Sequence, residues 1–183
     1  DSKDLNEWMA NEGFETATNF HLPYFDHPVL SNLWEAKEQG QKELIQRYTA
    51  EENRSFLNHI FQYTDFSHTP EPVKEYCLAA ETYATSIAFR NNTAIFINDY
   101  SGVSLSDSEM AILHRFAKEF DQTYTRFLDL QKAEAQAREA EVNLAVERVR
   151  AKALAMFKSE EILQVVIKLR NEILGLNIPS VTA

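Results

Sequence analysis

Hydrophobic residues recur at steps of three and four along the stretch from Ser106 to Lys158, which contains neither Pro nor Gly. This spacing predicts an amphipathic helix, and the Ala, Glu, Lys, Arg, Gln and Leu residues between them are good helix formers. Ser106 and Glu109 have the spacing of a capping box, so the helix is predicted to begin there. At about 1.5 Å per residue it would be roughly 75 Å long, more than a domain of this chain can enclose. We therefore expect most of it to extend beyond a globular part.

The long helix carries two apolar seams, separated by an Ala-rich, charged segment at residues 131–141. The first seam is aromatic, and the second has the four-three alternation of a coiled coil. Because the two seams do not share one register, a phase shift between them is predicted. We expect both seams to form a homodimer interface. Its predicted members are Leu113, Phe116, Phe120, Phe127, Val142, Val146, Val149 and Met156.

The first part of the chain alternates strand-like and helix-like patterns. Strands are predicted at residues 14–25, 43–49, 82–89 and 93–100, the last two joined as an antiparallel hairpin through Arg90, Asn91 and Asn92. Residues 5–10 are expected to form a short helix or the remnant of one. Further helices are expected after Pro28, after the capping box of Thr49 and Glu52, and at residues 73–78. The pattern predicts an α+β fold, a small antiparallel sheet with flanking helices.

A last helix is predicted from Ser159, with Ser159 as its cap, to Gly175. Its broad apolar stripe needs cover, so we expect it to pair with a copy of itself or to fold back on its neighbour. The predicted organisation is therefore an α+β module at residues 1–105, a connector helix at 106–158, and the first helix of a following domain, cut short, at 159–183. We expect the chain to be a fragment of a longer protein, and a truncation of the module at its N-terminus stays open.

The connector resembles a known family. The segments 115–117, 125–140, 147–151 and 159–161 are similar to the connector that links GAF- or PAS-like sensor modules in large bacterial multidomain signalling proteins. The resemblance covers roughly Leu113 to Leu163. It implies a GAF/PAS-like module followed by a signalling helix, upstream of a histidine kinase or nucleotide cyclase output, as in two-component systems.

Charge and composition exclude several partners. The net charge is −10, and residues 1–105 hold 16 acidic against 7 basic side chains. Such a surface repels phosphate backbones and anionic lipids, so neither nucleic acid nor membrane is an expected partner. Cys77 is the single cysteine and cannot form an intrachain disulfide, and no secretory or membrane-spanning pattern occurs. A cytoplasmic protein is the expectation.

No catalytic residue, metal site or cofactor is predicted. The four glycines are too dispersed for a phosphate-binding loop, and the five histidines lack metal-ligand spacing. His114 lies on the long helix, as phospho-accepting histidines do, but Arg115 and Phe116 follow it where histidine kinases have an acidic residue and then a Pro. A small-molecule ligand between the sheet and its helices remains an option, with an ordinary packed core as the alternative. The candidate lining residues are Phe20, Tyr24, Trp34, Tyr48, Tyr83, Phe89 and Phe96.

These patterns favour a non-catalytic sensory and relay region. It would pass a change in the module through a dimeric coiled coil to an output domain downstream in the same parent chain. Three alternatives stay open: a purely structural dimerisation module without a ligand, a histidine phosphotransfer role for His114, and a small-molecule enzyme.

Overall fold

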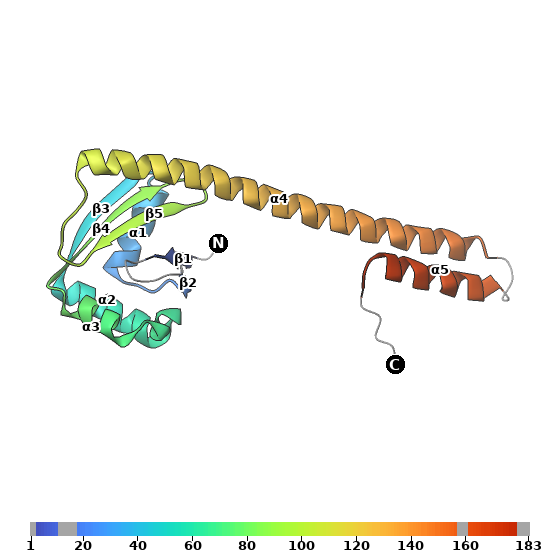
Figure 1. The fold of residues 1–183 in the computed structure, drawn as a ribbon, viewed down its shortest axis with the longest axis horizontal. Helices are drawn as coiled ribbons and strands as arrows, with labels where there is room; N and C mark the ends of the chain where they lie inside the picture. Colours follow the sequence, from blue (N-terminus) through green and yellow to red (C-terminus); the bar gives the residue numbers. More distant parts are fainter. Residues whose placement is uncertain (1–2, 11–17, 157–160, 179–183) are drawn as a thin grey trace. The chain divides into compact units, whose positions relative to one another are not determined.

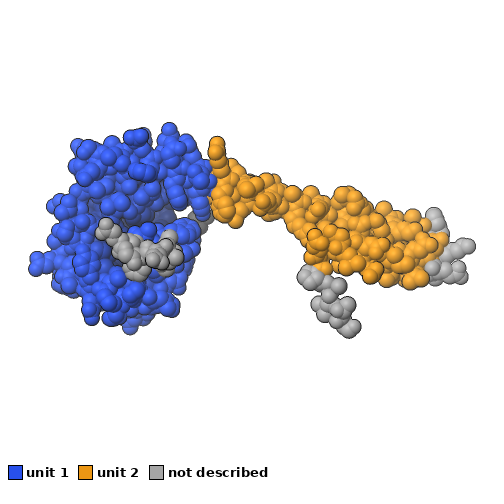
Figure 2. All heavy atoms as spheres, in the orientation of Figure 1, with its two compact units in different colours: residues 1–124 blue, residues 125–183 orange. Residues whose placement is uncertain are grey.

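The chain folds as an α+β protein with two small antiparallel sheets, flanking helices and one long helix (Figure 1). This computed structural model describes residues 3–10, 18–156 and 161–178. The chain divides into two compact units, residues 1–124 and 125–183, which Figure 2 shows in different colours. The elements in chain order are β1 (Leu5–Met9), β2 (Thr18–Leu22), α1 (Pro28–Glu38), β3 (Glu43–Thr49), α2 (Ala50–Tyr63), η1 (Asp65–His68), α3 (Glu71–Ala79), β4 (Thr82–Phe89), β5 (Ala94–Asp99), α4 (Asp107–Leu154) and α5 (Ile162–Gly175).

The larger sheet has the order β3-β4-β5, and both of its pairings are antiparallel. Its central strand is buried along its whole length from Tyr83 to Phe89, because the sheet is covered on both faces. One face packs on α1 through Ile87 and Phe89. The other face packs on the start of α4, where Ala88 contacts the cluster of Met110, Leu113 and Ala117. The predicted hairpin of β4 and β5 is confirmed.

The prediction of a helix at residues 5–10 is wrong. This segment is β1, which pairs antiparallel with β2 from Leu5 opposite Leu22 to Met9 opposite Thr18. The strand alternates along its length: Leu5, Glu7 and Met9 are partly buried, whereas Asn6 and Trp8 are exposed. A polar residue at an inward position concealed this period of two. The predicted strand at 14–25 is reduced to Thr18–Leu22 among the described residues, and residues 11–17 lie outside them.

Local capping explains where several helices begin. The Thr49 side chain accepts a hydrogen bond from the Glu52 backbone N–H, and the Glu52 carboxylate accepts one from the Thr49 N–H, so the predicted capping box is present. Hydrogen bonds from the Thr49 N–H and from the Thr49 hydroxyl to the Glu52 carboxylate hold the pKa of Glu52 below its usual value. His27 caps α1 through Nδ1, with Pro28 at the first helical position. The predicted cap at Ser159 lies outside the described residues.

The hairpin turn differs from its expected geometry. Asn91 and Asn92 do not adopt the positive φ expected of a tight hairpin, since Asn177 is the one non-glycine residue with positive φ in the described part of the chain. The turn is instead closed by a hydrogen bond from the Arg90 N–H to the Thr93 carbonyl (2.8 Å). It is also held by side chains of α4, described below.

Gly102 is expected to be essential for the loop between β5 and α4. Its φ is +80°, and a Cβ atom there would lie 2.0 Å from Thr82 Oγ1. We predict that Gly102→Ala lowers the free energy of unfolding by about 2 to 4 kcal/mol in urea titrations, through strain and steric overlap together. Gly40→Ala is the matched control: its φ is +71°, but nothing lies within 4 Å of the added Cβ, so only about 1 kcal/mol should be lost. Equal losses in the two variants would contradict the role of Thr82.

Candidate functional site

The interior of the first unit contains a buried carboxyl group. Glu7 lies between Leu5 and Met9 on the inward face of β1, and both of these neighbours pack against the main core cluster. The residue is partly buried, and this burial raises the pKa of Glu7 to about 7. Burial disfavours the charged form of a carboxyl, so the group is poised to gain or lose a proton near neutral pH.

Four tyrosine rings form a continuous series in the same unit. The ring centroids are 5.8 Å apart for Tyr48 and Tyr83, 5.3 Å for Tyr83 and Tyr100, and 6.0 Å for Tyr100 and Tyr76. Burial is the main cause that raises the pKa of Tyr83 and Tyr100, and the Glu7 carboxyl adds to it in both cases. Both phenols are therefore neutral at pH 7.

The seven predicted ligand residues do not line one cavity. Phe20, Tyr48 and Tyr83 belong to the main core cluster. A separate cluster around α1 holds the other three buried or partly buried members, Trp34, Phe89 and Phe96. Tyr24 is 37% exposed and lies under the Lys3 amine. The structure thus brings together only Phe20, Tyr48 and Tyr83, in one cluster with Cys77 and Tyr100, neither of which was predicted as a ligand residue.

A second polar site fixes the start of α4 to the β4–β5 turn. The buried Asp121 Oδ1 atom accepts hydrogen bonds from the Asn92 backbone N–H (3.0 Å) and from Thr93 Oγ1 (2.9 Å). Two turns earlier along the helix, the Arg90 guanidinium donates to the His114 carbonyl oxygen (2.5 Å). We call these residues, Arg90, Asn92, Thr93, His114 and Asp121, the turn latch.

His114 is engaged at both ring nitrogens. Nε2 lies 2.6 Å from the Glu43 carboxylate on β3, and Nδ1 lies 3.3 Å from the Arg90 guanidinium. Because Arg90 can only donate, Nδ1 acts as the acceptor and Nε2 as the donor. A phosphoryl group on Nε2 would have to replace this hydrogen bond and would lie against a carboxylate, so the geometry argues against a phospho-acceptor role.

The first half of α4 leaves an apolar face exposed. Its members are far from buried: Ile112 is 52% exposed, Phe116 65%, Phe120 49%, Phe127 50% and Leu130 58%. Leu113, which was predicted to share the dimer seam, is instead 7% exposed because it packs against the sheet. Sequence periodicity alone could not distinguish the sheet-facing side of this helix from the neighbouring apolar side.

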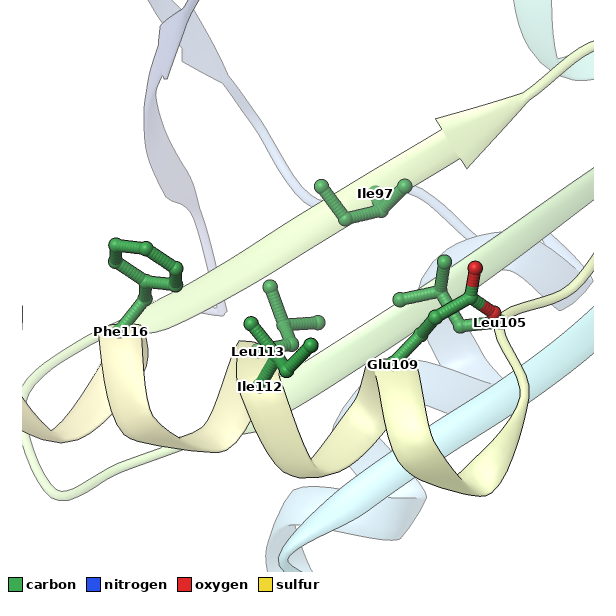
Figure 3. A pocket seen from close by; sticks show the side chains of 6 residues that line it. All are labelled: Ile97, Leu105, Glu109, Ile112, Leu113 and Phe116. Atoms are coloured by element: carbon green, nitrogen blue, oxygen red, sulfur yellow. The ribbon is translucent and has the colours of Figure 1, made fainter.

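A shallow apolar groove continues this face onto the sheet (Figure 3). It has a volume of about 280 Å³ and lies between the edge strand β5 and α4. Ile97 lines it from β5, and Ile112, Leu113 and Phe116 line it from α4. The exposed apolar surface therefore includes part of the sheet edge as well as the helix.

In the second unit, α5 lies antiparallel to the last part of α4. Arg138 donates to the Leu176 carbonyl, Arg148 forms a 3.4 Å ion pair with Glu172, and Lys152 donates to Gln164 (2.9 Å). Lys168 and then Arg148 hold the pKa of Glu172 below its usual value.

Of the two expected outcomes for the last helix, folding back on its neighbour is the one observed. Ala145 is buried in this pairing. Val142, Val149 and Met156 of the predicted second seam are partly buried, whereas Val146 is 50% exposed. α5 therefore covers three residues of the predicted dimer seam, Val142, Val149 and Met156.

The described residues hold no group of three or more His, Cys, Asp or Glu side chains arranged to bind a metal ion. Nor is any described helix both long and apolar enough to cross a lipid bilayer.

Comparisons of the chain with protein-family models, with curated proteins and with solved structures found no match.

Two residues of these sites were missed from the sequence for different reasons. Glu7 has a detectable signal, since it occupies an inward position in an alternating segment with Leu5 and Met9. Asp121 has none, because its partners lie in a turn 28 and 29 residues away along the chain.

The buried carboxyl of Glu7 predicts a pH-dependent stability. Its pKa of about 7 in the folded chain is above the unfolded value of about 4.3, so the folded state holds the extra proton between these values. The contribution of Glu7 to the free energy of unfolding is fully present below pH 4 and is lost as the pH rises toward 7. The free energy of unfolding of Glu7→Gln should therefore rise by roughly 2 to 3 kcal/mol relative to that of the wild type between pH 4 and pH 8.

Urea titrations at several pH values would measure this gain. Glu51→Gln is the matched control, since Glu51 is exposed on α2, and it should show no comparable trend. A pH-independent difference between Glu7→Gln and wild type would contradict burial of the carboxyl.

The turn latch predicts a local stability loss. Asp121→Ala removes two hydrogen bonds to a carboxylate and leaves the Asn92 N–H without this partner, which should cost about 2 to 4 kcal/mol in urea unfolding. Asp129→Ala, an exposed carboxylate on the same helix, should cost less than about 0.5 kcal/mol. Hydrogen exchange of the β4–β5 turn should accelerate only in Asp121→Ala, and similar exchange in both variants would refute the latch.

Proposed function

We propose that this chain is a non-catalytic sensory and relay region of a cytoplasmic signalling protein, with a GAF- or PAS-like module as its sensor. It acts as a homodimer through α4 and transmits a change in the module to an output domain farther along the parent chain. The α+β architecture followed directly by a long helix supports this proposal, as does the resemblance of the connector sequence.

The observation that carries the proposal is the exposed apolar face of α4. Phe116, Phe120, Phe127 and Leu130 follow steps of four, seven and three residues, with Thr123 at the intermediate position, so they form one four-three seam. Large aromatic residues that are about half exposed along such a seam are typical of a protein interface. A second copy of α4 is the occupant that this repeat fits.

The charges beside the seam are compatible with a parallel pair of helices. Positions 119 and 126 flank one side of the seam and hold Glu and Arg. The positions they would face in a parallel partner are 124 and 131, which hold Tyr and Gln. No like charges therefore oppose each other across the first half of the seam.

The turn latch gives this seam a physical link to the sheet. Asp121 and His114 are attached to the β4–β5 turn from the same stretch of α4 that displays Phe116 and Phe120. A shift of the turn relative to β3 would therefore alter how this stretch of helix is held. In a dimer, such a shift changes the relative stability of two seam registers, which is how two-state helical relays transmit signals.

A purely structural dimerisation module is the second candidate. The specific observation in its favour is that Phe20 stacks on Phe66 with centroids 4.2 Å apart, within a packed core. An unchanged dimer under every ligand and pH condition would favour this candidate over a sensor.

Dimerisation is tested by two adjacent substitutions. Phe127→Glu places a charge on the seam and should weaken the dimer at least about tenfold by analytical ultracentrifugation, because two like charges would meet in an apolar interface. Leu128→Glu is the matched control on another side of the helix and should leave the constant within about threefold. A wild-type chain that stays monomeric at all concentrations would end the proposal. So would equal effects of the two variants.

A further inference from the structure

The start of α1 is held by the side chain of His27, and both ring nitrogens of this residue are hydrogen-bonded. The Val29 backbone N–H donates to Nδ1 (3.2 Å), and Nε2 lies 2.9 Å from the Ser55 hydroxyl on α2. Ser55 in turn donates its own proton to the Glu52 carbonyl oxygen (3.0 Å). The imidazole therefore connects the first turn of α1 to α2.

These contacts require one particular form of the ring. A backbone N–H can only donate, so Nδ1 must be the acceptor and cannot carry a proton. The proton of the neutral ring is then on Nε2, which donates to Ser55 Oγ. A second proton can be added only at Nδ1, where it would point at the Val29 N–H. Two donors would then oppose each other, and the cap of α1 would be lost.

We propose that His27 is a proton-sensitive cap: the neutral ring holds the start of α1 against α2, and a ring protonated on Nδ1 releases it. Protonation also places a positive charge at the N-terminus of α1, where the helix dipole disfavours cations. This inference rests on the proposed sensor function and deepens it, because it names pH as a condition to which the module responds.

The surroundings of His27 favour the neutral ring. The Phe56 ring lies beside it, with centroids 5.3 Å apart, and the titratable groups that act on it are Glu52 and His59 on α2 and the adjacent Asp26. Burial is the main cause that lowers the pKa of His27 below its usual value; His59 adds to this effect, whereas Glu52 and Asp26 oppose it. The folded chain therefore binds fewer protons here than the unfolded chain. The cap is complete above about pH 6.5 and is lost as the pH falls below that value.

Release of this cap would affect the sheet. Val29 and Leu30, in the first turn of α1, are buried in the main core cluster. Farther along, α1 packs on β4, where Leu33 and Ile87 belong to one buried cluster. β4 continues into the turn that the turn latch attaches to α4. A looser start of α1 therefore supplies a change in the module of the kind that the proposed relay requires.

NMR spectroscopy of the full chain tests the proposal. At pH 7.5, the ¹⁵N spectrum of the His27 ring should show a proton on Nε2 and none on Nδ1. The protection factor of the Val29 amide, which corrects hydrogen exchange for its intrinsic rate, should fall at least about threefold between pH 7.5 and pH 5.0 in the wild type.

Three variants of His27 separate the cap from its titration. Asn and Asp are good N-caps that do not titrate between these pH values, so the Val29 protection should change by less than about 1.5-fold in His27→Asn and His27→Asp. His27→Ala removes the cap and should show the low protection at both pH values. His68→Asn is the matched control, since His68 is exposed and has no part in the cap of α1, and it should respond to pH as the wild type does.

The proposal is overturned if Nδ1 carries the proton at pH 7.5, if the Val29 protection of the wild type does not fall at pH 5.0, or if it falls equally in the Asn and Asp variants. Ultracentrifugation of the same samples tests the relay separately. A dimer whose Val29 protection is independent of pH refutes only this inference, whereas a monomer in which His27 controls that protection refutes only the dimeric relay.

Discussion

Attachment of α4 to the β4–β5 turn is the constraint on which the first unit depends. A helix next to a sheet can rotate unless polar contacts fix it, because apolar packing has little directionality. Here the buried Asp121 and the pair of Arg90 and His114 hold one side of α4 against the turn, while Met110 and Ala117 pack on the sheet. With that side fixed, the aromatic residues at 116 and 120 must face away from the sheet. The exposed face is thus a consequence of buried hydrogen bonds.

The interior of the same unit is stabilised mainly by apolar packing and not by polar contacts. The packed aromatic core around Phe20 and Phe66 stabilises the fold by burial, as in any small domain. Glu7 opposes that stability, since an inward carboxyl costs free energy whenever it is ionised. Carboxyl groups whose pKa values are shifted by burial are frequent at the functional sites of proteins. The Glu7 carboxyl therefore distinguishes this core from a purely aromatic one.

The sequence allowed most of the regular elements to be predicted, because these had a local cause, whereas β1 was mistaken for a helix. The capping box at Thr49 and Glu52 and the long helical period after Ser106 are encoded within a few residues. Features that depend on distant partners could not be predicted in this way. Leu113 and Phe116 lie on the same apolar side of the helix. Leu113 is buried and Phe116 is exposed because only Leu113 faces the sheet, and the sequence does not show where the sheet lies. The role of Asp121 likewise depends on a turn that is remote in sequence. The resemblance to sensor modules concerned the connector and said nothing about which interior residues matter.

The pairing of α5 with α4 places a condition on the proposed relay. In one chain, α5 already contacts the part of α4 that contains Val142, Ala145 and Val149, and it is held there by the ion pair of Arg148 with Glu172 and by the Lys152 hydrogen bond to Gln164. These polar contacts are exposed, so each stabilises the pair only slightly. A second copy of α4 that used the same Val residues would have to displace α5, whereas the polar contacts of α5 lie at residues 138, 148 and 152, beyond the part of the seam that holds Phe116 and Phe120. Dimerisation should therefore begin in the first half of α4, and its extension along the second half would depend on which helix covers the Val residues more favourably.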